Sequence, residues 1–129
     1  MKNFIFRWGP MILMMTLIFW ASSTPSTELP NVGKWDLFLK KGGHMYGYAM
    51  LAIAMQHGFQ HKNLVGSCLV WGLVTLYAIS DEFHQIFTVG RKATAIDVGI
   101  DMVGALIGLA VVLAWNYFKQ KSNSLQKMN

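Results

Sequence analysis

The fold is decided by residues 98–118, which read VGIDMVGALIGLAVVLAWNYF. This run reaches the length of about 20 mostly apolar residues that a helix needs to cross the hydrocarbon core of a bilayer. Three shorter apolar runs precede it, roughly at residues 8–21, 44–55 and 64–79. A membrane β-barrel would alternate apolar and polar residues, whereas these runs are continuous. The sequence therefore predicts an all-α integral membrane protein.

The composition agrees with a membrane domain. Of the 129 residues, 53% are hydrophobic and 13% are charged, whereas about 25% of the residues in an average soluble domain are charged. No internal repeat indicates a second domain. We expect one domain over residues 1–129, a small bundle of about four transmembrane helices. The expected helices are residues 8–22, 44–57, 64–80 and 96–118.

The first apolar run has two interpretations. Lys2 and Arg7 precede an apolar stretch that ends in the small residues Ala21, Ser22 and Ser23, as in a secretory signal peptide. Cleavage would remove one helix from the bundle. We expect the helix to be retained, because the other spans need a partner that covers their polar faces.

Charges near the ends of the runs predict the topology. Lys2, Arg7 and the lysines from Lys119 onward favour both termini in the cytoplasm under the positive-inside rule. The polar motifs would then face outward from the cytoplasmic membrane, together with all six acidic residues. The net charge of +5 does not indicate a nucleic-acid partner, because the basic residues are spread over the ends of the membrane segments.

A short window concentrates the acidic residues. It reads Ser80-Asp81-Glu82-Phe83-His84-Gln85 and continues through Gly90-Arg91 to Asp97 and Asp101. A charged side chain costs about 2.5–3.5 kcal/mol at the centre of a membrane helix, so these residues should lie near an interface or be paired. Charge in such a place indicates a functional site.

A polar stripe precedes this window in the chain. Lys41, His44 and Tyr48 are spaced i, i+3 and i+7, which places them on one face of a helix. Each alone has an ordinary structural explanation, such as a snorkelling lysine or an aromatic belt, but their alignment favours a site. We expect Gly42-Gly43 to turn the chain into the bilayer after an interfacial segment that begins near Trp35.

A second stripe follows Asp97, which shares one helix face with Asp101, Gly104 and Gly108. The glycine pair predicts close packing against a neighbouring helix. Asp101 lies about 5.4 Å, one helical turn, beyond Asp97, so it must take up a proton or find a cation. The candidate cations are Lys41, protonated His44, Arg91 and Lys92.

Taken in order, these motifs resemble the VanZ family. The resemblance covers residues 8–118 and rests on K-x-x-H-x-x-x-Y at 41–48, S-D-E-x-x-Q at 80–85, G-R at 90–91, Asp97 and G-x-x-x-G at 104–108. It implies a small multi-helix membrane protein in a family whose namesake is associated with low-level resistance to the glycopeptide teicoplanin. Asp101 departs from the family, in which asparagine is usual at this position, and this leaves the charge balance of the site open.

The preferred function is binding. The predicted ligand-binding residues are Lys41, His44, Tyr48, Ser80, Asp81, Glu82, Gln85, Arg91, Asp97 and Asp101. Such a site would hold the anionic head group of a membrane lipid, a lipid-linked envelope precursor or a lipoglycopeptide, with Arg91 and Lys41 on the anion. This function agrees with the teicoplanin resistance that the resemblance implies.

Two other functions remain open. A membrane enzyme would act on a phosphate or ester group of a lipid-linked envelope molecule, with Glu82 or Asp81 as general base, His44 as general acid and Gln85 orienting Glu82. Catalysis is the weaker hypothesis, because no nucleophile elbow, Walker loop or zinc-protease motif is present. Alternatively, the protein is a structural or assembly component in which buried ion pairs hold the helices in register.

No cofactor or metal site is predicted. Four residues could be considered as metal ligands, but their spacing in the sequence matches no standard metal site: His44, Asp81, Glu82 and His84. His57 and His61 are expected in a short cytoplasmic loop. Cys68, the single cysteine, has no partner for an internal disulfide and is expected to pack as a small apolar residue.

Overall fold

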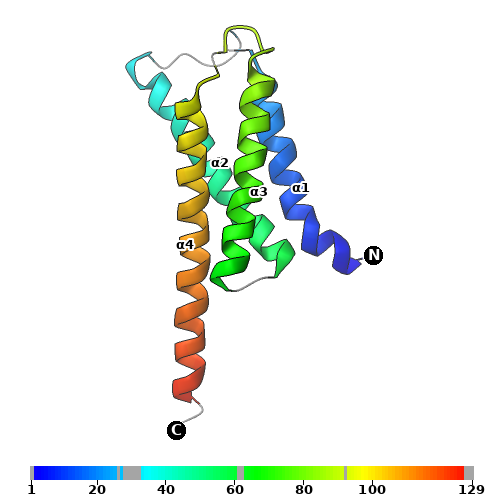
Figure 1. Ribbon diagram of the computed structural model, residues 1–129, viewed down its shortest axis with the longest axis vertical. Coiled ribbons are helices and arrows are strands. Elements are labelled where there is room, and N and C mark those ends of the chain that lie inside the picture. Colours follow the sequence, from blue (N-terminus) through cyan, green and yellow to red (C-terminus); the bar gives the residue numbers. More distant parts are fainter. Residues whose placement is uncertain (1, 26, 28–32, 61–62, 92, 127–129) are drawn as a thin grey trace.

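The chain forms a bundle of α-helices, shown in Figure 1 as a computed structural model that describes residues 2–25, 27, 33–60, 63–91 and 93–126. The elements are α1 (Lys2–Ser23), the short 3-10 helix η1 (Gly33–Trp35), α2 (Asp36–Phe59), α3 (Leu64–Gln85) and α4 (Ala95–Gln126). The described residues contain no strand. The predicted all-α fold is confirmed.

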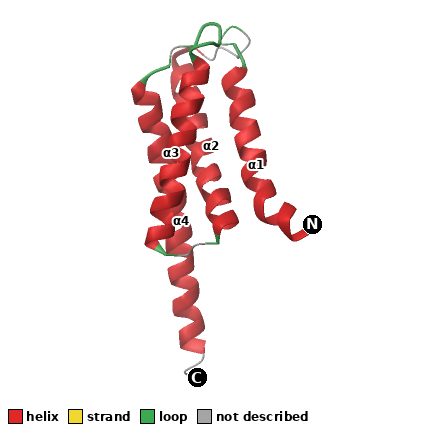
Figure 2. Cartoon of the chain, turned by 45° about the vertical axis from the view of Figure 1, so that its right-hand side comes forward, coloured by secondary structure: helices red, strands yellow, loops and turns green. Residues whose placement is uncertain are grey.

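The four long helices run alternately up and down (Figure 1). α2 packs against each of the other three, and its closest partner is α4. We call the end of the bundle where α1 and α3 finish and α2 and α4 begin the motif end. α1 begins and α4 finishes toward the opposite end, beyond which the last turns of α4 project (Figure 2). An even number of helices therefore brings both chain ends to one side.

Three of the described helices are long and apolar enough to cross a membrane: Phe4–Ser23, Leu64–Gln85 and Ala95–Gln126. α2 runs beside them and has 24 residues, a length of about 36 Å. Its buried face includes Tyr48, Leu51 and Ala52. Because other helices cover α2, it needs less apolar surface than a helix that faces lipid. This is the architecture of a small helical membrane protein.

Several predicted boundaries are wrong because polar residues that face the interior stay helical. α2 begins at Asp36, so Gly42-Gly43 lies within a continuous helix and does not turn the chain. The described glycines with positive φ are Gly33 and Gly90, so the pair has ordinary helical geometry. α2 also includes His57, which we had assigned to a loop, whereas His61 lies outside the described residues. α3 likewise continues from residue 80 to Gln85.

The glycine stripe of α4 packs against the backbone of α2. A Cβ atom added at Gly104 would overlap the carbonyl oxygen of Met45, and one added at Gly108 would overlap that of Ala49. Only glycine leaves room for so close an approach, as in other small-residue helix contacts. The predicted packing of this face is confirmed, and it holds the two helices that carry the polar stripes together.

α1 is an integral part of the bundle. Its residue Ile18 belongs to the buried core. The Tyr77 hydroxyl donates a 2.7 Å hydrogen bond to the Met15 carbonyl, and Arg7 Nε donates a 2.6 Å bond to the Gly58 carbonyl. Cys68 does not share this core: it is exposed on α3, where a membrane would cover it. α1 is therefore bonded to both α2 and α3, although most of its surface is exposed, and the cysteine lies outside the core.

Candidate functional site

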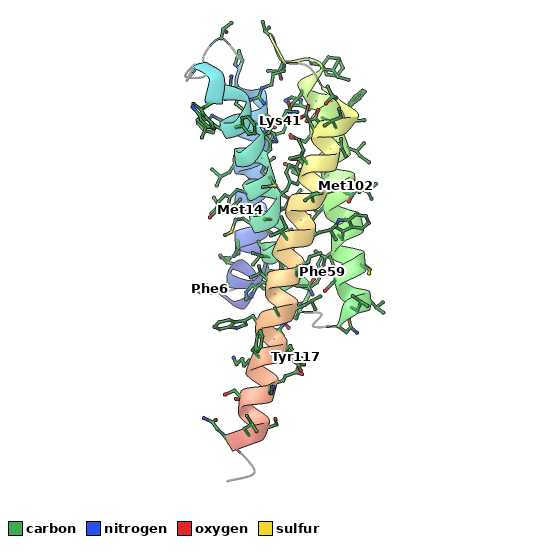
Figure 3. The ribbon with its side chains drawn as sticks, turned by 90° about the vertical axis from the view of Figure 1, so that its left-hand side faces the viewer. Phe6, Met14, Lys41, Phe59, Met102 and Tyr117 are labelled. Atoms are coloured by element: carbon green, nitrogen blue, oxygen red, sulfur yellow. The ribbon has the colours of Figure 1, made fainter. Side chains whose placement is uncertain are left out.

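The polar motifs meet at the motif end, where Figure 3 shows Lys41 near the start of α2 and Phe59 and Tyr117 toward the opposite end. α3 contributes Asp81, Glu82 and Gln85 from its last turns, because the apolar side of the helix faces outward there and the polar side is buried. Ser80 does not join them. Its side chain is exposed and donates to the Tyr77 carbonyl at 2.7 Å.

A buried hydrogen-bond network holds Asp81. The Ser22 hydroxyl donates to Asp81 Oδ2 at 2.7 Å, and Gln85 Nε2 donates to both Ser22 Oγ and Asp81 Oδ2 at 3.2 Å. Gln85 therefore orients Asp81, one turn away in α3, and not Glu82 as we had predicted. Sequence reasoning missed Ser22, although a small polar residue that ends an apolar run is a usable signal.

Asp97 is paired with Lys41 at the rim of the cluster. The Lys41 ammonium lies 2.7 Å from Asp97 Oδ1, and the two side chains are 34% and 24% exposed. Thr94 caps the start of α4, because its hydroxyl donates to Asp97 Oδ2 at 2.6 Å and accepts from the Asp97 N–H at 3.3 Å. Glu82 Oε2 accepts from the Thr94 N–H at 3.2 Å. These contacts fix the entry of the chain into α4.

Asp101 lies deeper and lacks such partners. Its side chain is 1% exposed, and neither carboxylate oxygen accepts a hydrogen bond from a described residue. Of the four predicted cations, His44 is beside it, with Nδ1 3.8 Å from Asp101 Oδ1. Lys41 is held by Asp97, and Lys92 lies outside the described residues. The Tyr48 hydroxyl is also buried without a hydrogen bond.

Arg91 fastens the end of α1. Its guanidinium donates to the Ala21 carbonyl at 2.6 Å, the Thr24 carbonyl at 3.3 Å and Gln85 Oε1 at 3.4 Å. A cation at a helix C-terminus satisfies free carbonyls and opposes the negative end of the helix dipole. Gly90, with φ of +76°, adopts the left-handed conformation just before it. Within the described part of the chain, no carboxylate pairs with Arg91.

A groove lies between α1 and α2 beside this cluster. Its volume is about 320 Å³, and its lining residues are Met14, Leu17, Ile18, Ala21, Leu39, Lys40, Gly43, His44, Gly47 and Arg91. We call it the α1–α2 groove. Most of its wall is apolar, and Lys40, His44 and Arg91 bring basic groups to it. Sequence reasoning missed this groove, although Lys40, Gly43 and Gly47 follow i, i+3 and i+7 along one helix face.

His44 connects the groove with the acidic cluster, because it lines the groove and also lies beside Asp101. His84 is separate from both: its ring stacks on Phe19 with centroids 4.6 Å apart, and its Nε2 is 3.1 Å from Ser23 Oγ. Among the described side chains, no three His, Cys, Asp or Glu groups are arranged to hold a metal ion. The geometry thus presents an apolar groove with a basic rim and a buried acidic cluster behind it.

Comparison with known proteins places this arrangement in a family. No curated protein and no solved structure matches the chain. The family model described as VanZ/LLP1 matches residues 7–116, a stretch that includes both polar stripes and the whole acidic window. The chain therefore belongs to the VanZ/LLP1 family.

Proposed function

We propose that this protein binds an anionic amphiphile, whose apolar chain lies in the α1–α2 groove and whose charged head lies beside Arg91 and Lys40. The observation that carries the proposal is the combination of apolar and basic residues in one groove. Its volume, about 320 Å³, falls at the small end of the range for ligand pockets, about 300–1,000 Å³. It therefore suits part of an acyl chain or a compact head group better than a whole lipid.

The charges of the groove favour an anion. Arg91 is bonded to neutral carbonyl and amide oxygens, so its positive charge is not cancelled by those partners. A planar guanidinium binds phosphate or carboxylate through two parallel hydrogen bonds. None of the described residues that line the groove is acidic. Lys41, which we had expected on the anion, points to Asp97 instead, whereas Lys40 lines the groove.

The ligand would come from the outer leaflet if the motif end faces outward. Arg7, Lys119 and Lys121 lie toward the opposite end of the bundle, and the positive-inside rule would place that end in the cytoplasm. The candidate ligands are then an anionic lipid, a lipid-linked envelope precursor or a lipoglycopeptide. A link to teicoplanin resistance would follow if occupation of the groove alters what the antibiotic meets at the outer surface.

Filling the groove tests this function. A Cβ atom at Gly43 or at Gly42 meets no other atom within 4 Å, but only Gly43 lines the groove. Gly43→Leu should therefore occupy the groove without disturbing the helix, and Gly42→Leu is the matched control. The measurement is the amount of phosphatidylglycerol or phosphatidylcholine that the purified protein retains after gel filtration in detergent.

We expect the wild type and Gly42→Leu to retain phosphatidylglycerol in preference to phosphatidylcholine by about tenfold, which corresponds to about 1.4 kcal/mol. Gly43→Leu should lose most of this retention. Equal retention by the two leucine variants, or equal retention of both lipids by the wild type, would show that the groove is not the binding site.

Hydrolysis of a lipid phosphate or ester is the second candidate function. It is favoured by His44, which lines the groove with Asp101 behind it, as an acid–base pair would require. We prefer binding because Glu82 and Asp81, the candidate bases, are buried outside the groove lining. The test is incubation with extracted envelope lipids. A product of altered mass that wild type forms and Glu82→Gln does not would favour the enzyme.

A further inference from the structure

The acidic cluster behind the groove contains buried oxygen atoms that form no regular hydrogen bond with any described residue. They are both carboxylate oxygens of Asp101, Oδ1 of Asp81 and the Tyr48 hydroxyl. The three residues are at most 3% exposed. Buried polar groups in native proteins are almost always hydrogen-bonded to protein or water, so a set of four such atoms indicates a missing partner.

These atoms belong to one cluster. The Tyr48 hydroxyl interacts electrostatically with both Asp81 and Asp101 and comes within hydrogen-bonding range of Asp81, although no contact with a described residue has the full geometry of a hydrogen bond. Its ring is close to those of His44 and Tyr77, with centroid distances of 6.4 Å and 6.2 Å. The hydroxyl therefore lies beside two carboxylates, one from α3 and one from α4.

The charges around the cluster do not balance among the described residues. The titratable and charged groups that face it are Lys41 and His44 from α2, Tyr77 and Glu82 from α3, Asp97 from α4 and Arg91 from the loop before α4. Lys41 is paired with Asp97, and Arg91 is bonded to carbonyl and amide oxygens. Among these described groups, Lys41, Arg91 and a protonated His44 would bring three positive charges to the four carboxylates of Asp81, Glu82, Asp97 and Asp101, which leaves negative charge uncompensated.

We propose that Asp81, Asp101 and Tyr48 form a buried binding site for a small monovalent cation, either sodium or a proton carried on these oxygens. All the available ligands are hard oxygen atoms, which suit such ions. A divalent metal fits less well, because the described residues contain no arrangement of three His, Cys, Asp or Glu ligands. The site does not depend on the amphiphile proposed above.

Cation-dependent stability tests this site. The thermal unfolding midpoint of the full chain in non-ionic detergent would be measured at low and high sodium, with choline replacing sodium at constant ionic strength, and again across a pH series without sodium. A ligand that binds only the folded state raises the midpoint as its concentration rises. The variants are Asp101→Asn and Tyr48→Phe. Ser80→Ala changes an exposed side chain directly before Asp81 that points away from the cluster, and it is the control.

We expect a rise of roughly 5 °C in the wild type, with either sodium or acidification as the cause. A response to sodium identifies a sodium site, and a response to acid alone identifies a proton site. Ser80→Ala should keep the response, and Asp101→Asn should lose it. Tyr48→Phe keeps the ring but removes the hydroxyl, so it should weaken the response to the cation. This variant provides the test if Asp101→Asn does not fold. A wild type without either response, or variants that all respond alike, would overturn the proposal.

Discussion

The two ends of this bundle treat buried polar side chains differently. At the opposite end, the Gln56 amide donates to Ser67 Oγ at 3.0 Å, and Ser67 donates to the Asn63 carbonyl at 3.2 Å. At the motif end, the buried groups are carboxylates, and three of the four oxygens of Asp81 and Asp101 accept no hydrogen bond from a described residue. The buried polar groups are therefore neutral at one end and acidic at the other. Polar groups that bond to each other join helices, whereas unpartnered acceptors indicate a ligand.

The charges differ in the same way. At the opposite end, Arg7 bonds to a carbonyl of α2 and lies over the ring of Trp8, 5.3 Å from its centroid. At the motif end, Arg91 also bonds to carbonyls but in addition lines the α1–α2 groove. Arg7 therefore only joins helices, whereas Arg91 joins helices and also lies beside a groove that has room for an anion.

The largest effect should come from the packing that both ends share. Gly104→Ala should lower the free energy of unfolding by about 3 kcal/mol or more, because its Cβ would overlap the Met45 carbonyl oxygen. Gly99→Ala, in the same helix, meets no atom within 4 Å and should be neutral or slightly stabilising. Thermal unfolding in detergent measures both. Equal stability of the two variants would mean that α2 and α4 are not in close contact.

An intermediate effect is expected at Arg91. Arg91→Ala removes bonds to the Ala21 and Thr24 carbonyls and to Gln85, so we expect the free energy of unfolding to fall by about 1–3 kcal/mol. We expect the variant to lose its lipid retention as well. Arg91→Lys keeps the charge but not the fork of donors, and it should recover part of the retention. If Arg91→Ala lost stability but kept full lipid retention, Arg91 would be as purely structural as Arg7.

The smallest effect should come from the half-buried ion pair at the rim. Lys41 and Asp97 are 34% and 24% exposed, and pairs of this kind contribute about 0–1 kcal/mol. A double-mutant cycle with Lys41→Met and Asp97→Asn should give a coupling energy in this range that decreases with salt. A coupling of several kcal/mol would instead favour the structural hypothesis, in which ion pairs hold the helices in register.

Much of the fold could be predicted because a membrane helix must be continuously apolar where it meets lipid, and residues 98–118 meet that condition by themselves. The helix ends could not be predicted from hydropathy, because residues 36–43 and 80–85 stay helical although polar side chains such as Lys41, Asp81 and Gln85 turn toward other helices. Hydropathy predicts which helix segments face lipid, but it does not predict a helix segment whose polar face is buried against other helices.

The site could be predicted only where helical periodicity decides it. Spacing placed Lys41, His44 and Tyr48 on one face, and all three lie at the motif end or just below it. Spacing did not show that Ser80, directly before Asp81, points away from the cluster. The α1–α2 groove depends on how two helices approach each other and on a loop that brings in Arg91, and neither is encoded in a local pattern.

The most direct test of the account is to purify the wild type and Gly43→Leu from membranes and identify the bound lipids by native mass spectrometry. The account predicts an anionic amphiphile of unchanged mass on the wild type and its loss from Gly43→Leu. Bound species that are the same in both proteins, or a wild type that carries only neutral lipids, would contradict the claim that the α1–α2 groove binds an anionic amphiphile.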